Sequence, residues 1–271
     1  MRRFLMVSVS ALGLGLGLSA AQAADVIAPE PVANWTGFHI GAGGGVGYNT
    51  YDAESEFYKD IDTGDGGDIF YDYFLGIRGD DLGKWYGFGT VELGFDFQFD
   101  NSPLLIGILG NYDFNGKGKA EAEAGTDEPD GDYSYSYIGA QLDDSWFVGG
   151  RVGFIMQEST LLYALAGYTW ADGKVEAYHE FEDNDEDDAA LFSDKKDVGG
   201  FTVGGGIEHL LTDNISVKVE YRHDFLDDIK WSQAAFDPEW GIDDDNLHRG
   251  KVKFGRDTVR AVLSWRFNMF Q

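Results

Sequence analysis

The chain has 271 residues, 48 of them acidic and 20 basic, so its formal net charge is −28 at pH 7. A surface of this charge repels nucleic acid and attracts cations. The chain has no cysteine, which excludes disulfides and thiolate metal sites. Strong acidity can indicate disorder, but aromatic residues make up 15% of the chain and argue against it. With 38 glycines and only five prolines, the composition favours a protein built from many β-strands.

The first residues have the pattern of an export signal. Arg2 and Arg3 precede an uncharged, apolar run from Phe4 to Leu18, and Ala21-Gln22-Ala23 then gives a small-x-small cleavage pattern. The apolar run is shorter than the roughly 20 residues that a membrane-spanning helix needs. We therefore predict export followed by cleavage. The predicted parts of the chain are a signal peptide at residues 1–23, a short leader at 24–34 and one folded domain at 35–271.

Eight segments alternate between apolar and polar residues with a period of two, which predicts β-strands with two different faces. In chain order they span residues 35–48, 85–99, 104–114, 145–156, 161–170, 201–211, 215–222 and 258–267. The seventh is the clearest, with the run Ile215-Ser216-Val217-Lys218-Val219-Glu220. In the fifth segment both faces are apolar, so the sequence does not decide which face points inward.

Alternation alone fits a soluble β-sandwich as well as a membrane barrel, because the strands of both have one apolar face. Two features favour the barrel. The chain carries an export signal, and aromatic residues lie near both ends of the apolar faces, as they would at two lipid–water interfaces. Examples are Trp35 and Tyr48 in the first strand, Trp85 and Phe99 in the second, and Phe267 in the last.

The lengths of the connections also favour the barrel. The predicted short connections are Asp100–Pro103, Gln157–Thr160 and Thr212–Asn214, and the predicted long ones are 50–84, 116–132, 175–196 and 226–251. Strict alternation of short periplasmic turns and long extracellular loops is typical of outer-membrane barrels. The predicted fold class is therefore all-β, with an eight-stranded antiparallel up-and-down transmembrane β-barrel. The even number of strands places both chain ends in the periplasm.

Three segments and the last strand carry a resemblance to a known family. The segments are WTGFHIGAGGGVGY, GFGTVELGFDFQF and FTVGGGIEHLLTDNISVKVEYRHDF, and the last strand ends in Trp265-Arg266-Phe267. In this order they resemble the small outer-membrane β-barrel proteins of alphaproteobacteria, porin-like surface antigens similar to the OmpA transmembrane domain. The resemblance implies surface exposure and envelope roles, and it supplies no catalytic residue. Because Asn268-Met269-Phe270-Gln271 follows the usual terminal aromatic residue, we expect the assembly signal among Trp265, Phe267 and Phe270.

The polar faces of the predicted strands carry charged residues of both signs. They are Glu92, Asp96, Asp113, Arg151, Glu208, Lys218, Glu220, Arg222 and Arg260. The interior of an eight-stranded barrel is just wide enough for side chains to fill, and buried charges must be paired. A structural network that plugs the lumen is favoured over a gated ion path. We expect Glu208 and Lys218 to lie at similar depth, and Arg260 to lie near Glu220.

Other motifs give no specific site. The run GAGGGVG lacks both the spacing and the lysine of a phosphate-binding loop. The segment Asp60–Asp65 has Gly64 and Asp65 where a calcium loop needs an acidic residue and then glycine. The four long connections hold 32 of the 48 acids, which predicts diffuse attraction of divalent cations. The five histidines show no metal or catalytic pattern, so no enzyme and no cofactor are expected.

The sequence thus predicts a structural outer-membrane barrel that displays acidic surface loops. The alternative is a narrow, cation-preferring porin. The expected partners are outer-membrane lipid and lipopolysaccharide, the barrel-assembly machinery and divalent cations at the loops, and nucleic acid is not among them.

Overall fold

The computed structural model describes residues 34–59, 62–63, 69–70, 73–115, 118–127, 133–156, 159–182, 187–237 and 241–268. All of them lie in one compact unit, Ala33–Gln271. The predicted signal peptide, the leader before Asn34 and Phe270 fall outside the described residues, and so does most of the segment Asp60–Asp65.

The described residues form β-strands joined by turns. The strands are β1 (Gly37–Lys59), β2 (Asp62–Thr63), β3 (Ile69–Phe70), β4 (Tyr73–Gln98), β5 (Leu104–Asn115), β6 (Gly118–Asp127), β7 (Tyr133–Met156), β8 (Thr160–Glu182), β9 (Asp187–Leu210), β10 (Ile215–Leu226), β11 (Ile229–Asp237) and β12 (Gly241–Asn268). In this part of the chain, no helix is long and apolar enough to cross a membrane.

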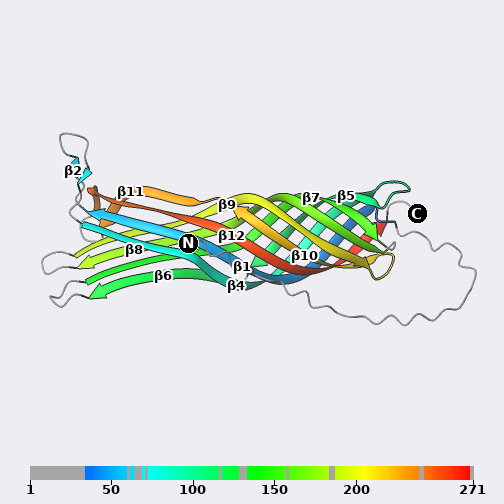
Figure 1. The fold of residues 1–271 in the computed structure, drawn as a ribbon, viewed down its shortest axis with the longest axis horizontal. Coiled ribbons are helices and arrows are strands. Elements are labelled where there is room, and N and C mark those ends of the chain that lie inside the picture. The colour runs from blue at the N-terminus through cyan, green and yellow to red at the C-terminus, as the bar shows by residue number, and fades with distance from the viewer. Residues whose placement is uncertain are drawn as a thin grey trace, which may run out of the picture. The chain divides into compact units, whose positions relative to one another are not determined.

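Eight of these strands close into an antiparallel ring, which confirms the predicted fold class (Figure 1). The order is β1-β4-β5-β7-β8-β9-β10-β12, and β12 pairs with β1 to complete the circle. A path of directly paired residues around the ring runs through Tyr48, Asp257, His223, Val203, Ala166, Gly150, Ile108, Phe95 and Phe38. It starts at Tyr48 and returns to β1 at Phe38, ten residues away, so the strands are tilted and staggered as barrel closure requires.

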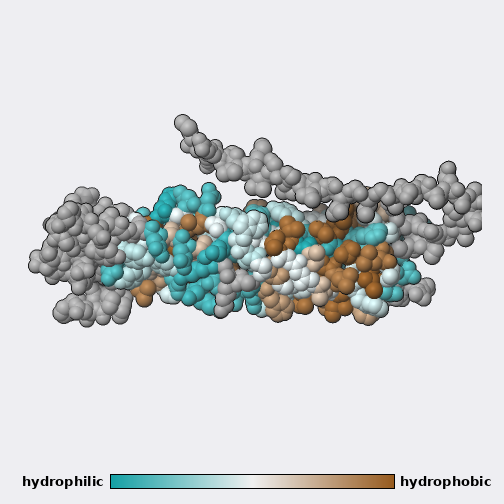
Figure 2. Space-filling model, turned by 90° about the horizontal axis from the view of Figure 1, so that it is seen from below, coloured by the Kyte–Doolittle hydropathy of each residue, from teal (hydrophilic) through white to brown (hydrophobic). Residues whose placement is uncertain are grey.

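The part of the barrel nearest the short connections has apolar side chains outside. We call it the belt section, and Figure 2 shows its brown surface beside a teal surface farther along the barrel. The last outward aromatic residues on the strands are the half-buried Tyr48 and the exposed Trp85, Phe114, Trp146, Trp170, Phe201 and Phe225. The strand β8, whose facing the sequence left open, exposes Leu162 and Trp170 and buries Leu161 and Leu165. Trp35, predicted to lie among the outward aromatic residues, is instead fully buried, and that prediction is wrong.

Beyond these aromatic residues lies a part of the barrel that we call the outer section. Here apolar side chains point inward and polar side chains point outward. On β1 the exposed residues become Asp52 and Glu54, while Tyr51, Ala53 and Phe57 are buried. The alternation on β1 continues without a slip, because inward residues stay at odd positions from His39 to Phe57. The outer section is therefore apolar inside and polar outside, as in a water-soluble protein.

The segments predicted as long loops are mostly strand, which corrects that prediction. The segment 50–84 contains the end of β1 and the start of β4, and the segment 116–132 contains β6. The other two contain the end of β8, the start of β9, β11 and the start of β12. In fact the period-two pattern continues through them, as in Tyr51-Asp52-Ala53-Glu54, with the polar residues now facing outward.

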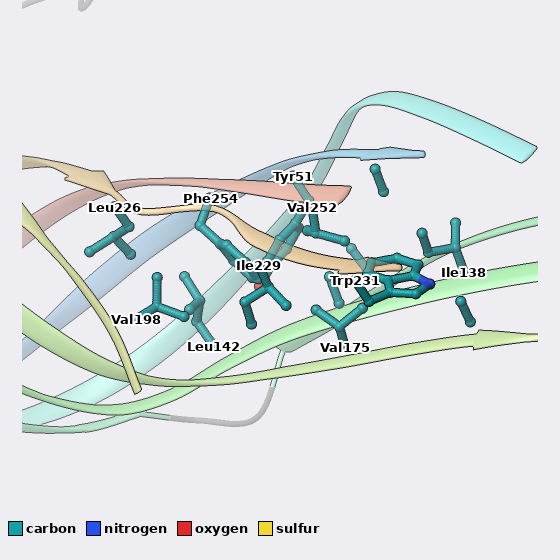
Figure 3. Close-up of a cluster of buried hydrophobic side chains, with 14 of the residues drawn as sticks. Tyr51, Ile138, Leu142, Val175, Val198, Leu226, Ile229, Trp231, Val252 and Phe254 are labelled. Carbon is teal, nitrogen blue, oxygen red and sulfur yellow. The ribbon is translucent and has the colours of Figure 1, made fainter. Parts of the chain in front are cut away.

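In the outer section the ring becomes two four-stranded sheets. One has the order β4-β1-β12-β11 and the other β6-β7-β8-β9. Among the described residues, no ladder joins β4 to β6 or β9 to β11. Figure 3 shows the buried cluster between the sheets, to which Tyr51, Val252 and Phe254 contribute from one sheet and Ile138 and Val175 from the other.

Trp231 on β11 closes the edge between the sheets next to β9. Its ring stacks on Phe192 of β9, with 4.4 Å between ring centroids and 5° between ring planes. Since no ladder connects these two strands in the described part of the chain, side-chain packing holds this edge together.

We predict that Trp231→Ala opens the outer section and leaves the belt section folded. Loss of a buried tryptophan costs about 3–5 kcal/mol, and here the loss falls on the contact between the two sheets. The measurement is limited proteolysis of refolded protein, combined with the heat-dependent shift in gel mobility that reports the closed barrel. Trp85→Ala is the control, because Trp85 is 69% exposed on the belt surface. Equal protease resistance of parent and Trp231→Ala protein would contradict this role.

Candidate functional site: the charged lumen and the histidine bridge

The lumen of the belt section contains twelve buried charged side chains. The acids are Glu92, Asp96, Asp113, Glu208, Glu220 and Asp224, and the bases are Arg151, Lys218, Arg222, Arg256, Arg260 and Arg266. Each of these residues is at most 3% exposed. Six formal negative charges therefore meet six formal positive charges, so the set is electrically balanced.

The layer nearest the short connections is a closed ring of two arginines and two acids. Arg151 donates from Nε and Nη2 to the two carboxylate oxygens of Asp96, at 2.9 and 2.6 Å, and from Nη1 to Glu208 at 2.8 Å. Arg266 binds the same two acids, at 2.7 Å to Asp96 and 3.1 Å to Glu208. It also donates to the main-chain oxygen of Trp35 at 2.6 Å and lies over the ring of that residue. Trp35 is thus part of the interior.

A second layer is centred on two glutamates. The Nζ atom of Lys218 lies 2.6 and 2.5 Å from the two carboxylate oxygens of Glu92. Arg222 donates to Glu220 at 2.6 Å, and the hydroxyl of Tyr163 donates to the other oxygen of Glu220 at 2.7 Å. Buried charges are tolerated when paired and hydrogen-bonded in this way.

A third set of pairs lies toward the outer section. Arg260 binds both carboxylate oxygens of Asp113, each at 3.1 Å. Arg256 donates to Asp224 at 2.6 Å, and Thr202 donates to the same carboxylate at 2.7 Å. The network therefore extends through the depth of the belt section.

Apolar side chains and Tyr163, mostly from β5, β7 and β8, pack beside the ion pairs in the belt lumen. They form one buried cluster, which contains Trp35, Leu105, Leu109, Phe147, Ile155, Leu161, Tyr163, Leu165 and Leu210. An inward glycine makes room for the ion pairs, because a Cβ atom on Gly107 would lie 2.2 Å from Oδ1 of Asp96. The low solvent exposure of the charged residues shows that neighbouring protein atoms surround them.

All nine charged residues singled out from the sequence lie in this network, but some partners differ. Lys218 is the ladder partner of Glu208, as expected, yet its ammonium group binds Glu92 across the lumen. Arg260 is the ladder partner of Glu220, with Nε 3.6 Å from Oε1, yet its two shorter bonds go to Asp113.

Sequence reasoning missed three charged members of the network and one histidine. Asp224, Arg256 and Arg266 are buried ion-pair partners, and His39 lies 3.4 Å from Asp96 and 3.6 Å from Glu92. The alternation continues beyond the predicted segments 215–222 and 258–267. Following it would have placed Asp224 and Arg256 on the polar faces of β10 and β12. Trp265 and Phe267 are exposed on the belt surface; their role in assembly stays a prediction.

A second buried polar cluster lies in the outer section, and we call it the histidine bridge. Ser55 Oγ lies 2.8 Å from Nε2 of His179 and 2.9 Å from Nε2 of His248. Ser136 Oγ lies 2.9 Å from Nδ1 of His179. Ser55 and His248 belong to β1 and β12, whereas His179 and Ser136 belong to β8 and β7, so the bridge joins the two sheets. All four residues are buried.

The histidine bridge has no feature of a working hydrolytic or metal site in the described residues. A serine beside a histidine can act as a nucleophile when a third group orients the histidine and a substrate can reach it. Here no described carboxylate bonds either imidazole, and neither ring is accessible to solvent. Within the same residues, no group of three or more histidine or acidic side chains is placed to hold a metal ion.

Burial changes the protonation of both histidines, which lie outside the belt section. It lowers the pKa of His248 from 6.5 to about 4. Burial, together with the proximity of His248, lowers the pKa of His179 to about 3. Both rings are therefore neutral at neutral pH.

The chain is similar to known outer-membrane proteins. The family model described as "Outer membrane protein beta-barrel domain" matches residues 10–267. The 31 kDa outer-membrane immunogenic protein of Brucella melitensis is 26% identical over 98% of this chain and all of that protein. A 22 kDa outer membrane protein of Rhizobium leguminosarum is 26% identical over 72% of this chain and 65% of its own. Among solved structures, OprG of Pseudomonas aeruginosa aligns with a TM-score of 0.45 and 12% identity, covering 88% of this chain and 100% of OprG.

We predict that Arg151→Ala lowers the free energy of unfolding by about 3–5 kcal/mol, because it leaves Asp96 and Glu208 with one cation fewer in a buried site. The measurement is urea-dependent unfolding of the refolded barrel in lipid vesicles. Lys174→Ala is the matched control: Lys174 also binds a glutamate, Glu176, at 2.6 Å, but its side chain is 43% exposed. The control should change stability by no more than about 1 kcal/mol. Similar losses of stability in the two variants would show that water reaches the ion pairs of the lumen.

Proposed function

Because the chain belongs to the outer membrane protein β-barrel family, we propose that it is a structural, surface-displayed protein of the outer membrane. In this proposal the belt section anchors the protein in lipid and the outer section projects from the cell. The barrel is not an enzyme and requires no cofactor. Binding of this protein to the barrel-assembly machinery and to divalent cations remains a prediction from the sequence.

The observation that carries this proposal is the filling of the lumen. Twelve balanced charges and an apolar cluster occupy the belt section, and a second apolar cluster follows in the outer section. An ion that entered would have to break ion pairs such as Arg151–Asp96 and then pass apolar side chains such as Val175. Each step costs several kcal/mol or more. The filled lumen supports a structural role over the alternative of a narrow, cation-preferring porin.

Surface display is supported by the chemistry of the outer section. Its outward residues are mostly charged or polar, such as Asp52, Glu54 and Lys253, as on the surface of a soluble protein. Its strands continue past the belt, as β1 does to Lys59. The relative from Brucella melitensis is named as an immunogenic protein of the outer membrane. By analogy, we propose that the outer section of this chain is the part that meets molecules outside the cell.

The proposal predicts no ion conduction. Purified, refolded protein added to a planar lipid bilayer should give no current steps beyond those of a bilayer treated with the same detergent alone. The Arg151→Ala protein should behave in the same way if it folds, because the apolar clusters remain. Regular, cation-selective steps from the unmodified protein would overturn the structural proposal and favour the porin.

A second prediction concerns orientation. Because the chain has no cysteine, single cysteines can report which end of the barrel faces outward. Glu54→Cys in the outer section should react with a membrane-impermeant maleimide on intact cells. Asp100→Cys, in the short connection between β4 and β5, should react only after the outer membrane has been permeabilised. The opposite pattern would place the outer section in the periplasm.

A further inference from the structure

The described residues of the outer section include a polar connection between its two sheets that contains titratable groups, besides the hydrogen bond between Tyr51 of β1 and the main chain of Leu142 of β7. Along both edges, β4 to β6 and β9 to β11, no ladder joins them in the described residues. The contact between the sheets is mainly apolar, as the cluster around Val175 and Val252 shows. Within this apolar interior, the hydrogen bond between Ser55 Oγ and His179 Nε2 crosses from one sheet to the other at 2.8 Å.

Neutral imidazoles satisfy both the donor and the acceptor capacity of the Ser55 hydroxyl in the histidine bridge. Ser55 can donate to one ring and accept from the other, since each neutral imidazole has one donor and one acceptor nitrogen. A proton added to both rings would make every ring nitrogen a donor. Ser55 Oγ could accept from both rings, but its own O–H would lose its ring acceptor. Nδ1 of His248, which has no hydrogen-bond partner among the described residues, would carry an unsatisfied N–H.

The surroundings of the bridge give no compensation for added positive charge. The rings next to it are Phe57 on β1, Phe192 on β9 and Trp231 on β11. On the neighbouring strands, Ile77 of β4 is the ladder partner of Ser55, and Ala122 of β6 packs against the same apolar cluster. The two histidines are the titratable groups that face each other, and no described carboxylate acts on either of them.

We propose that the histidine bridge is an acid-sensitive lock, which holds the two sheets of the outer section together at neutral pH and releases them when both histidines take up protons. The belt section stays closed, because its strands are joined by continuous ladders and its ion pairs do not involve the bridge. The part released would expose the apolar cluster around Trp231 on the outer side of the barrel.

The direction and the pH range follow from linkage. In an opened outer section the histidines are solvated and have an ordinary pKa near 6.5, whereas in the closed form the pKa of His248 is about 4 and that of His179 about 3. The open form therefore binds more protons than the closed form between pH 6.5 and about 4. In this range the open-to-closed ratio should rise about 10-fold for each histidine with every unit by which the pH falls. Two histidines give about 100-fold per pH unit.

Distance measurements between spin labels test this proposal on the full chain in lipid. Glu54→Cys on β1 and Ser193→Cys on β9 are both exposed and lie on different sheets. Their distance should be narrowly distributed at pH 7.5 and become longer and broader near pH 4.5. A second labelled pair in the belt, Val46→Cys on β1 with Leu162→Cys on β8, should keep one distance at both pH values.

The variant His179→Gln with His248→Gln separates titration from general acid effects. It retains polar side chains but cannot take up the two protons, so its Glu54–Ser193 label distance should not change between pH 7.5 and 4.5. If the double variant does not fold, each single variant should reduce the pH dependence by about half. His209→Gln, at an exposed histidine of β9, should respond like the parent. An unchanged distance in the parent, or an equal change in the double variant, would overturn the proposal.

Discussion

The ion pairs inside the belt section are the constraint on which the rest of the structure depends. Lipid surrounds this part of the barrel, and a buried charge without a partner costs several kcal/mol. The barrel meets the constraint with equal numbers of buried acids and bases. The bonds from Asp96 to Arg151, from Glu92 to Lys218 and from Asp113 to Arg260 also join strands that share no ladder. The same ion pairs thus neutralise the buried charges and connect opposite strands of the barrel.

The outer section continues the same strands in a different environment. There the outside is water, so apolar burial inside replaces ion pairing. On β1 the exchange of faces requires no change in alternation, because the residue types alone change after Asn49. Where the surrounding lipid no longer demands that every backbone group be paired, the ring can divide into two sheets. Their contact then rests on side chains such as Trp231 and Phe192.

Most of the belt section could be predicted from the sequence, because alternation and barrel width are local and geometric rules. The eight strands and the nine charged residues follow from these rules. The partner of Lys218 could not be predicted, since its ammonium group reaches Glu92, 126 positions away, instead of its ladder neighbour. The histidine bridge was equally hidden, because Ser55 lies 124 positions from His179 and 193 from His248. Long-range contacts of this kind depend on the ring order and on side-chain length.

The outer section was missed for a different reason. The predicted segments end at the belt, although Tyr51, Ala53, Ser55 and Phe57 preserve the alternation on β1. A strand with acidic residues on one face and apolar ones on the other is an ordinary strand in water. The outer section therefore keeps the period of two, with the apolar and polar faces exchanged.

The uninterrupted strands have a mechanical consequence. β1, β8 and β12 each run as a single strand from the belt into the outer section, so the two parts share a backbone framework with no flexible linker between them. The outer section cannot swivel freely above the membrane in the way that a tethered domain does. Its tilt is set by the tilt of the barrel, and any molecule that approaches from outside meets it in one fixed attitude relative to the membrane plane.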